Sequence, residues 1–181
     1  FQNLLSSPKL RGNLGEQILY DTLSQTLPSS HYQTQYKFKE GKTVDAIIKT
    51  DSGIISIDAK FPMENFLQMT KAETDTERKR CLKDFIRQVK KHIDDVQNKY
   101  ILPGEGTLEY AVMYVPSEKV FYEIVMDSEE LLQYAHDRHV LLVSPNTFLY
   151  YLRTILIGLE RAKIEEETER IIELLKTIQK E

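Results

Sequence analysis

In the first part of the chain, the spacing of apolar residues changes from that of a helix to that of strands. Residues 10–27 repeat apolar side chains at the spacing of a helix, and Pro28-Ser29-Ser30 interrupts that pattern. Three short runs follow, in which apolar residues alternate with polar ones or dominate: residues 32–38, 43–49 and 54–61. Gly41-Lys42 and Asp51-Ser52-Gly53 separate these runs and suit tight turns. We therefore predict a helix followed directly by an antiparallel three-stranded meander.

The rest of the chain has the pattern of helices placed between two buried strands. An amphipathic pattern covers residues 75–100, with one apolar stripe: Leu82, Phe85, Ile86, Val89, Ile93, Val96 and Tyr100. Two almost wholly apolar runs predict strands that are covered on both faces: residues 109–115 and 140–143. Short helices are expected at residues 118–125 and 128–137, and Ser144-Pro145 suits the start of a last helix that runs almost to Glu181. This order of elements predicts a mixed α/β domain around one sheet.

The length of 181 residues suits one buried core rather than two. We assign residues 1–160 to this core domain and residues 161–181 to a C-terminal helical tail. Apolar residues are sparse in the tail and are separated by acidic ones: Ile164, Ile171, Leu174, Leu175 and Ile178. A thin apolar stripe on a long helix can pack back on the core or join a coiled coil, so a homo-oligomer formed through this helix is one expectation.

Composition limits the cellular setting and the kind of partner. The chain has no apolar run long enough to span a membrane, and its single cysteine, Cys81, has no internal partner for a disulfide or a zinc site. These features favour a cytoplasmic protein with no membrane contact from this segment. The chain opens on Phe1 rather than Met, so we expect a longer natural protein that has room for an N-terminal anchor. The net charge of −4 excludes a generally basic nucleic-acid surface and leaves only a local basic patch.

Two charged residues in the predicted strand 54–61 are the most informative chemical feature. Because side chains alternate along a strand, Asp58 and Lys60 share one face. The other face takes the three apolar neighbours: Ile57, Ala59 and Phe61. Charges on a strand suited to burial are costly unless they meet each other, a metal ion or a wet cleft. A surface salt bridge is the simpler explanation of an isolated Asp-x-Lys sequence.

A second aspartate comes from the preceding strand. One register has a two-residue turn at Asp51-Ser52 and pairs Thr50 with Gly53, which places Asp45 opposite Asp58. The alternative, a three-residue loop, shifts the register by one and needs a bulge near Asp45 to restore the alignment. Either register brings two carboxylates close together, which destabilises a sheet unless a cation lies between them. A Mg²⁺ or Mn²⁺ ion held by carboxylates, water and phosphate oxygens fits this arrangement.

These residues supply the parts that phosphodiester hydrolysis needs. Asp45 and Asp58 would hold the metal, which polarises a phosphate and lowers the pKa of a bound water. Lys60, one strand step from Asp58, can stabilise developing negative charge or position the attacking water. Glu16 on the first helix completes the metal shell directly or through a water molecule. We therefore predict a catalytic set that consists of Asp45, Asp58, Lys60 and Glu16.

The sequence also resembles known proteins. An initial helix, an Asp, a hairpin and then Asp-x-Lys resemble the PD-(D/E)xK nuclease superfamily. Along nearly its whole length the chain is similar, more specifically, to the RmuC family, through motifs in the family's order: Arg11-Gly12-Asn13-Leu14-Gly15-Glu16, Ile57-Asp58-Ala59-Lys60-Phe61-Pro62, His92-Ile93, Lys99-Tyr100, Val112-Met113-Tyr114-Val115-Pro116-Ser117-Glu118 and Val143-Ser144-Pro145-Asn146-Thr147. Val44 stands where the superfamily usually has Pro, and Leu14 where the family often has Trp. Neither departure removes a charged group.

The resemblance implies a restriction-endonuclease-like α/β core and a role in DNA recombination that limits inversions and rearrangements. It implies DNA as the partner and magnesium-dependent DNA hydrolysis as the activity. A nuclease fold can also bind DNA or a recombination protein without cutting, so a non-catalytic module is the alternative. The intact acidic pair favours the enzyme.

The predicted helix 75–100 adds two further groups of candidates. Four basic residues recur at helical spacing and form one ridge: Arg80, Lys83, Arg87 and Lys91. Such a ridge can follow a DNA backbone, or it can be a solvated face balanced by neighbouring aspartates. In related nucleases this helix presents a Gln or a charged group to the active site. The resemblance therefore makes Gln88, Lys91 and His92 candidates for supporting the catalytic set.

Overall fold

The computed structural model describes residues 8–127 and 129–178, which form one mixed sheet and the helices around it. The elements of the first half are α1 (Pro8–Thr26), the 3-10 helix η1 (Ser29–His31), β1 (Tyr32–Lys37), β2 (Thr43–Thr50), β3 (Gly53–Asp58), α2 (Met63–Thr70) and α3 (Asp75–Tyr100). Those of the second half are the 3-10 helix η2 (Pro103–Glu105), β4 (Thr107–Tyr114), α4 (Glu118–Asp127), α5 (Glu129–Asp137), β5 (Val140–Val143) and α6 (Pro145–Ile178). The predicted α/β class is thus confirmed.

The sheet has five strands in the order in which they occur in the chain, β1 to β5. The first three pair antiparallel, which confirms the predicted meander, whereas β4 and β5 extend the sheet in parallel from β3. β3 is therefore the central strand and pairs with a neighbour on each side. The carboxyl ends of β3, β4 and β5 lie together at one edge of the sheet. This edge is where α1 and the loops that follow these strands meet.

Apolar side chains form a separate cluster on each face of the sheet. On one face the stripe of α3 packs with side chains of α2, α4 and α5, including Phe66, Phe85 and Leu131. On the other face α1 packs with the first part of α6, through Leu19 and Phe148. Burial on both faces explains the continuous apolar run at residues 111–114 of β4. The same prediction is wrong for the edge strand β5, in which Leu141 is 42% exposed.

Two helix starts are capped by side-chain hydrogen bonds, and the second is the predicted start at Ser144-Pro145. The Thr74 side chain accepts a hydrogen bond from Glu77 N at 3.2 Å, so α3 begins at Asp75 and runs to Tyr100 as expected. At the start of α6 the Ser144 hydroxyl accepts from Thr147 N at 3.2 Å, and the Thr147 hydroxyl accepts from Ser144 N at 2.7 Å. These reciprocal bonds satisfy backbone donors that a helix start leaves free.

The structure corrects two features of the sequence around β3. The predicted strand 54–61 ends at Asp58, because the next backbone N–H, that of Ala59, donates to the Asp45 side chain instead of a neighbouring strand. Phe61 consequently packs on the α3 side, not on the face of Ile57 and Ala59 as predicted. The eight-residue helix α2 was not predicted, since its two buried side chains, Phe66 and Met69, make too short an apolar pattern.

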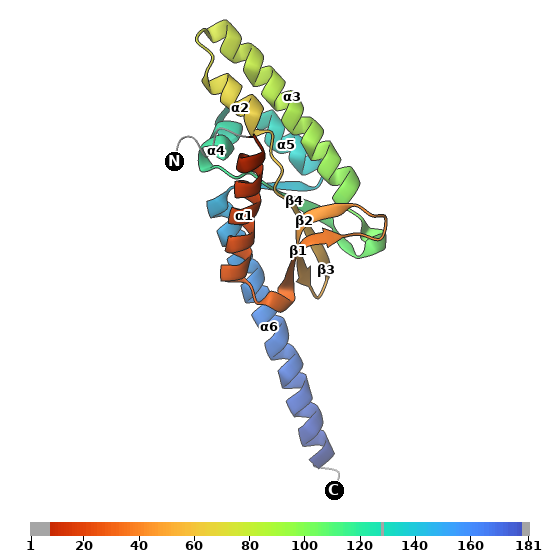
Figure 1. Cartoon of the computed structure of the whole chain (residues 1–181). Coiled ribbons are helices and arrows are strands. Elements are labelled where there is room, and N and C mark those ends of the chain that lie inside the picture. Colours follow the sequence, from red (N-terminus) through yellow and green to blue (C-terminus); the bar gives the residue numbers. More distant parts are fainter. Residues whose placement is uncertain (1–7, 128, 179–181) are drawn as a thin grey trace.

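The last helix, α6, has two different halves. Its first part packs against the body of the domain through side chains up to Leu156, and residues up to Glu166 line a hollow with His31 and Asp51. The last part of the helix projects away from the other elements (Figure 1). Ile157, Ile164 and Ile171, spaced by seven residues, are 54%, 62% and 57% exposed. Residues 179–181 of the predicted tail lie outside the described residues. No helix within residues 8–127 and 129–178 has the combined length and apolar character that crossing a membrane requires.

Candidate active site

The β2–β3 hairpin brings the two predicted aspartates to adjacent strands. Thr50 pairs with Gly53, so the turn consists of Asp51-Ser52, as in the first of the two predicted registers. The pairing continues without a shift to Ala46 and Ile57. The next position along this register places Asp45 opposite Asp58. The turn length therefore places the two aspartates at facing positions of adjacent strands.

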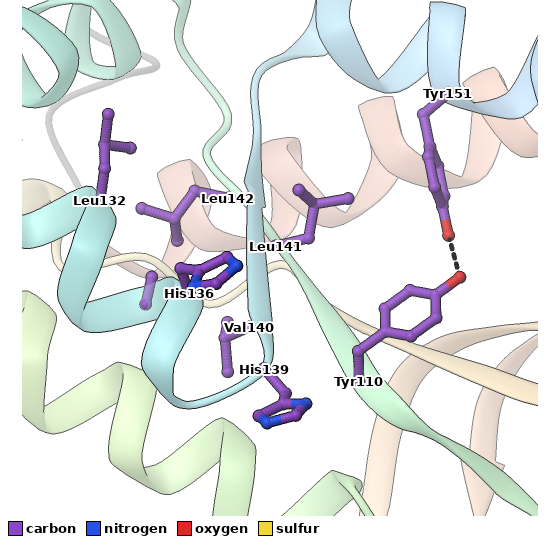
Figure 2. A pocket seen from close by; sticks show the side chains of 9 residues that line it. Tyr110, Leu132, His136, His139, Val140, Leu141, Leu142 and Tyr151 are labelled. Atoms are coloured by element: carbon purple, nitrogen blue, oxygen red, sulfur yellow. Dashed lines mark hydrogen bonds between the residues drawn. The ribbon is translucent and has the colours of Figure 1, made fainter.

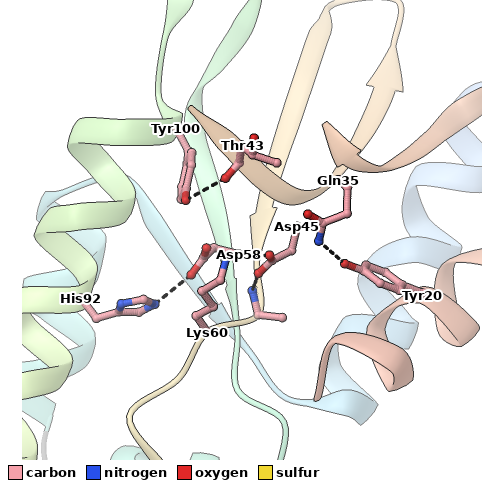
Figure 3. A network of polar contacts seen from close by, with 9 residues as sticks. Tyr20, Gln35, Thr43, Asp45, Asp58, Lys60, His92 and Tyr100 are labelled. Carbon is pink, nitrogen blue, oxygen red and sulfur yellow. Dashed lines mark hydrogen bonds and ion pairs between the residues drawn. The ribbon is translucent and has the colours of Figure 1, made fainter. Parts of the chain in front are cut away.

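Asp45 is almost fully buried and accepts two hydrogen bonds. Its side chain is 1% exposed, Ala59 N donates to Oδ2 at 2.8 Å, and Lys60 Nζ donates to Oδ1 at 2.8 Å (Figure 3). Charge-assisted bonds of this length are strong. The predicted neighbour of Asp58, Lys60, is thus an ion-pair partner of Asp45 across the hairpin.

The Lys60 ammonium keeps its charge at neutral pH. Burial acts to lower the pKa of Lys60, but the hydrogen bond and attraction of Asp45, helped by Asp58, raise it to about 12. The side chain is still 56% exposed, so a ligand in solvent can reach it. Lys60 therefore acts as a fixed positive charge rather than as a proton acceptor.

Asp58 is held from the opposite direction by α3. Its side chain is 2% exposed, and Oδ2 lies 2.8 Å from Nε2 of His92. An ionised carboxylate can only accept, so the imidazole donates this hydrogen bond. His92, 34 residues further along the chain, thereby fixes the orientation of the Asp58 side chain. Sequence spacing could not reveal this contact.

Glu16 approaches the same carboxylates from α1. Partial burial raises the pKa of Glu16, as do the negative charges of Asp45 and, less strongly, Asp58. The Lys60 charge and the nearby Tyr20 hydroxyl lower the pKa of Glu16. Three acidic groups thus interact in one region, and a cation placed among them would be stabilised by all three.

A glycine allows α1 to lie close to the loop after β4. A Cβ atom at Gly15 would lie only 3.1 Å from the Cβ of Pro116. Any larger residue would separate the helix from this loop or force a shift. Because Glu16 is the next residue, this close packing helps to determine where its carboxylate lies.

The oxygen ligands are of the kind that Mg²⁺ takes, although no cage of ligands is formed. Within residues 8–127 and 129–178, no group of three or more His, Cys, Asp or Glu side chains has the arrangement of a metal site. Magnesium commonly uses one or two carboxylates and completes its shell with water and substrate phosphates. Asp45 and Asp58 fit such a site, and the Lys60 ammonium is the cation that balances Asp45 in its absence.

A cavity of about 310 Å³ opens beside these residues. Lys60 lines one part of it, and Gln88, Lys91 and His92 from α3 line another. The three α3 residues that the sequence indicated as supporting residues therefore converge on the same space. Among them, His92 is directly hydrogen-bonded to a carboxylate of the site.

The predicted basic ridge lies on the solvent side of α3. Arg80, Lys83, Arg87 and Lys91 are all exposed, and Arg87 forms an ion pair with Asp84 at 2.7 Å. A helix rises about 1.5 Å per residue, so Arg80 lies roughly 16 Å along the axis from Lys91, which lines the cavity. The ridge therefore leads away from the site along the helix.

Two tyrosines near the site were not predicted from the sequence. The Tyr100 hydroxyl donates to the Thr43 carbonyl at 3.1 Å, and burial, then the Asp58 charge, raise its pKa to about 12. Tyr20 accepts a hydrogen bond from Gln35 Nε2 at 2.6 Å. Tyr20 lies four residues after Glu16 in a helix, so helical spacing could have suggested that their side chains meet.

A second hollow, of about 500 Å³, lies away from the carboxylates at the edge strand β5 (Figure 2). It is lined mostly by apolar and aromatic side chains, among them Leu141 and the hydrogen-bonded pair Tyr110 and Tyr151, whose oxygens are 2.9 Å apart. None of the described residues that line it is acidic. This hollow therefore does not belong to the catalytic candidates.

Comparison with known proteins agrees with the sequence motifs. The model of the RmuC family matches residues 1–181, and the chain belongs to this family. The DNA recombination protein RmuC of Escherichia coli strain K12 is 33% identical over 156 residues, which cover 81% of this chain and 33% of that protein. Named RmuC homologues of Yersinia pestis and Vibrio cholerae are 33% and 32% identical, over 81% and 85% of this chain.

The chain spans about a third of the length of these curated relatives. No solved structure matches it. Sequence similarity thus establishes the family, and the geometry of the candidate site is that of the fold described above.

Proposed function

We propose that this domain is a Mg²⁺- or Mn²⁺-dependent deoxyribonuclease domain with a PD-(D/E)xK core, acting in DNA recombination. The observation that carries the proposal is the pair of buried carboxylates, Asp45 and Asp58, on adjacent strands beside the Lys60 ammonium. The relatives' names, DNA recombination protein RmuC, support the biological setting. Limiting DNA inversions and rearrangements is the role that the family resemblance implies.

Each side chain has a distinct part in this proposal. Asp45 and Asp58 hold the metal, supported by Glu16, and a bound metal supplies Lewis acidity toward a phosphate and a water molecule. Lys60 supplies a permanent positive charge near the reacting phosphate. His92 keeps the Asp58 carboxylate oriented, while Gln88 and Lys91 contact the substrate from the cavity wall.

A non-catalytic DNA-binding module is the second candidate. The Asp45–Lys60 ion pair favours it, because the buried aspartate is already neutralised without a metal. The two candidates are separated by incubating labelled single-stranded, duplex and forked DNA with the protein in Mg²⁺, Mn²⁺ or EDTA. Cleavage that EDTA abolishes supports the nuclease. Binding that persists in EDTA, with no cleavage in either metal, supports the module.

The basic ridge on α3 is expected to hold the DNA backbone. The triple substitution Arg80→Gln, Lys83→Gln and Lys91→Gln should weaken DNA binding by about tenfold or more at low salt, because fewer neutralised phosphates release fewer counterions. The slope of log affinity against log salt concentration should become shallower by about one for each phosphate that the variant no longer neutralises. Fluorescence anisotropy with a labelled duplex across a salt series measures both quantities.

The projecting part of α6 offers a matched control. Substituting Arg161, Lys163 and Arg170 by Gln removes the same number of positive charges from an exposed helix far along the chain. This control should bind DNA with the affinity of the wild type. Equal decreases in affinity in the two triple variants would mean that the ridge on α3 has no special role.

The exposed isoleucines of α6 are proposed to pair with those of a second copy. Ile157, Ile164 and Ile171 follow a heptad spacing and are exposed, and the last part of the helix projects away from the other described elements. Light scattering should give a mass above that of the monomer for the wild type and the monomer mass for a chain truncated after Leu159. An unchanged mass would count against pairing through α6.

A further inference from the structure

Gln35 has an unusual backbone conformation next to the candidate site. Its φ angle is +48°, in the left-handed region that residues with a Cβ rarely adopt, although it lies inside β1. Its neighbours pair regularly, Thr34 with Ala46 and Tyr36 with Val44, so Gln35 lies opposite Asp45. Strained backbone of this kind is found preferentially at functional sites.

The alternation of both strands is interrupted at this pair. In a regular strand Tyr32 and Tyr36 share a face, but Tyr32 packs in the cluster with α1, and Tyr36 in the cluster with α3. On β2, Ala46 and Val44 are divided between the two clusters in the same way. The chain therefore changes faces at Gln35 and Asp45. At this position the Asp45 carboxylate accepts the hydrogen bond from Ala59 N, the first residue after β3.

The Gln35 side chain makes a second connection, to α1. Its Nε2 donates to the Tyr20 hydroxyl at 2.6 Å (Figure 3), and Tyr20 lies one helical turn after Glu16 on α1. Because the Gln35 side chain is exposed, burial does not offset the cost of its backbone conformation. One residue thus contacts, through backbone and side chain, the two elements that carry the acidic groups.

We propose that Gln35 is a positioning residue that aligns Asp45 through its left-handed backbone and holds α1, the helix that carries Glu16, through its hydrogen bond to Tyr20. The inference rests on the proposed function as far as metal binding is concerned. The placement of Asp45 against Ala59 N is independent of any metal. This difference allows the two ideas to be tested separately.

The first test follows the Ala59 amide in the metal-free protein. Gln35→Val places a β-branched residue, which resists a positive φ, at this position, whereas Gln35→Gly accepts it freely. Hydrogen exchange of the Ala59 amide, followed by NMR, should accelerate by about tenfold or more in Gln35→Val and remain near the wild-type rate in Gln35→Gly. Gln33→Val, at an exposed position of the same strand, is the control and should not change this rate.

The second test measures Mn²⁺ affinity by titration calorimetry. Gln35→Gly and Tyr20→Phe both remove the hydrogen bond that ties β1 to α1 one helical turn from Glu16, and should weaken Mn²⁺ binding by about tenfold, a loss typical of changes in the groups that orient metal ligands. Wild-type affinity in both variants, or unchanged Ala59 exchange in Gln35→Val, would overturn the inference. Absence of Mn²⁺ binding by the wild type would instead refute the proposed nuclease, and the Ala59 exchange would still decide the role of Gln35.

Discussion

Replacing Asp58 with asparagine is expected to lower Mg²⁺-dependent DNA cleavage by about 100-fold or more, since a metal stabilises the transition state by several kcal/mol. Asparagine has nearly the shape of aspartate and retains an oxygen that accepts the hydrogen bond from His92. The substitution therefore removes the negative charge with little effect on packing. It removes both a repulsion of Glu16 and an attraction to Lys60, so the two effects on stability oppose each other.

Initial cleavage rates on a labelled duplex, at several Mg²⁺ concentrations, measure this effect, and circular dichroism checks that the variant is folded. Asp51→Asn is a suitable control, because Asp51 lies exposed in the turn of the same hairpin. Its cleavage rate should equal that of the wild type. Full activity in Asp58→Asn would remove the central residue of the proposed site and refute the nuclease.

Replacing Lys60 with methionine is expected to impair both activity and metal-free stability. Methionine fills a similar volume but leaves the buried Asp45 carboxylate without its cation. Breaking a fully buried ion pair costs about 3 to 5 kcal/mol, and the partial exposure of Lys60 reduces the expected loss to about 1 to 2 kcal/mol. Cleavage should fall by about 100-fold, as when one preorganised electrostatic group is removed from an active site.

Lys60→Met also distinguishes a metal site at Asp45 from a simple salt bridge. If Mg²⁺ binds at Asp45, it should compensate for the missing ammonium, so added Mg²⁺ should raise the melting temperature more in Lys60→Met than in the wild type. Lys49→Met, at an exposed position of β2, should show the wild-type response. If Mg²⁺ stabilises neither protein, Asp45 is a structural aspartate neutralised by Lys60.

The dependence of the unfolding free energy on pH should show what the Lys60 ammonium contributes to stability. The pKa of Lys60 is raised from 10.5 to about 12 in the folded protein, so its contribution is fully present below pH 10.5. It is lost as the pH rises through about 12. The difference in unfolding free energy between wild type and Lys60→Met should therefore be constant at neutral pH and diminish only in this alkaline range.

Local patterns in the sequence were sufficient for much of the fold. The 3.6-residue period of α3 predicted both ends of that helix, because a helix is formed by contacts between near neighbours. The short apolar run of β5 and the Ser144 cap of α6 were equally local. The facing positions of Asp45 and Asp58 also followed from strand period and turn length, once a two-residue turn was assumed.

The chemistry of the site depended on contacts between distant segments, which no local pattern specifies. The end of β3 at Asp58 results from the bond between Ala59 N and Asp45, and the contact between His92 and Asp58 depends on how α3 packs across the sheet. The left-handed backbone of Gln35 has no sequence signal, since glutamine is an ordinary residue in strands. The sequence by itself thus determined which charged groups the chain brings to one edge of the sheet. Only the tertiary structure decided which of them touch, because the energy of burying a charge is settled by its partners in space rather than by its neighbours in the chain.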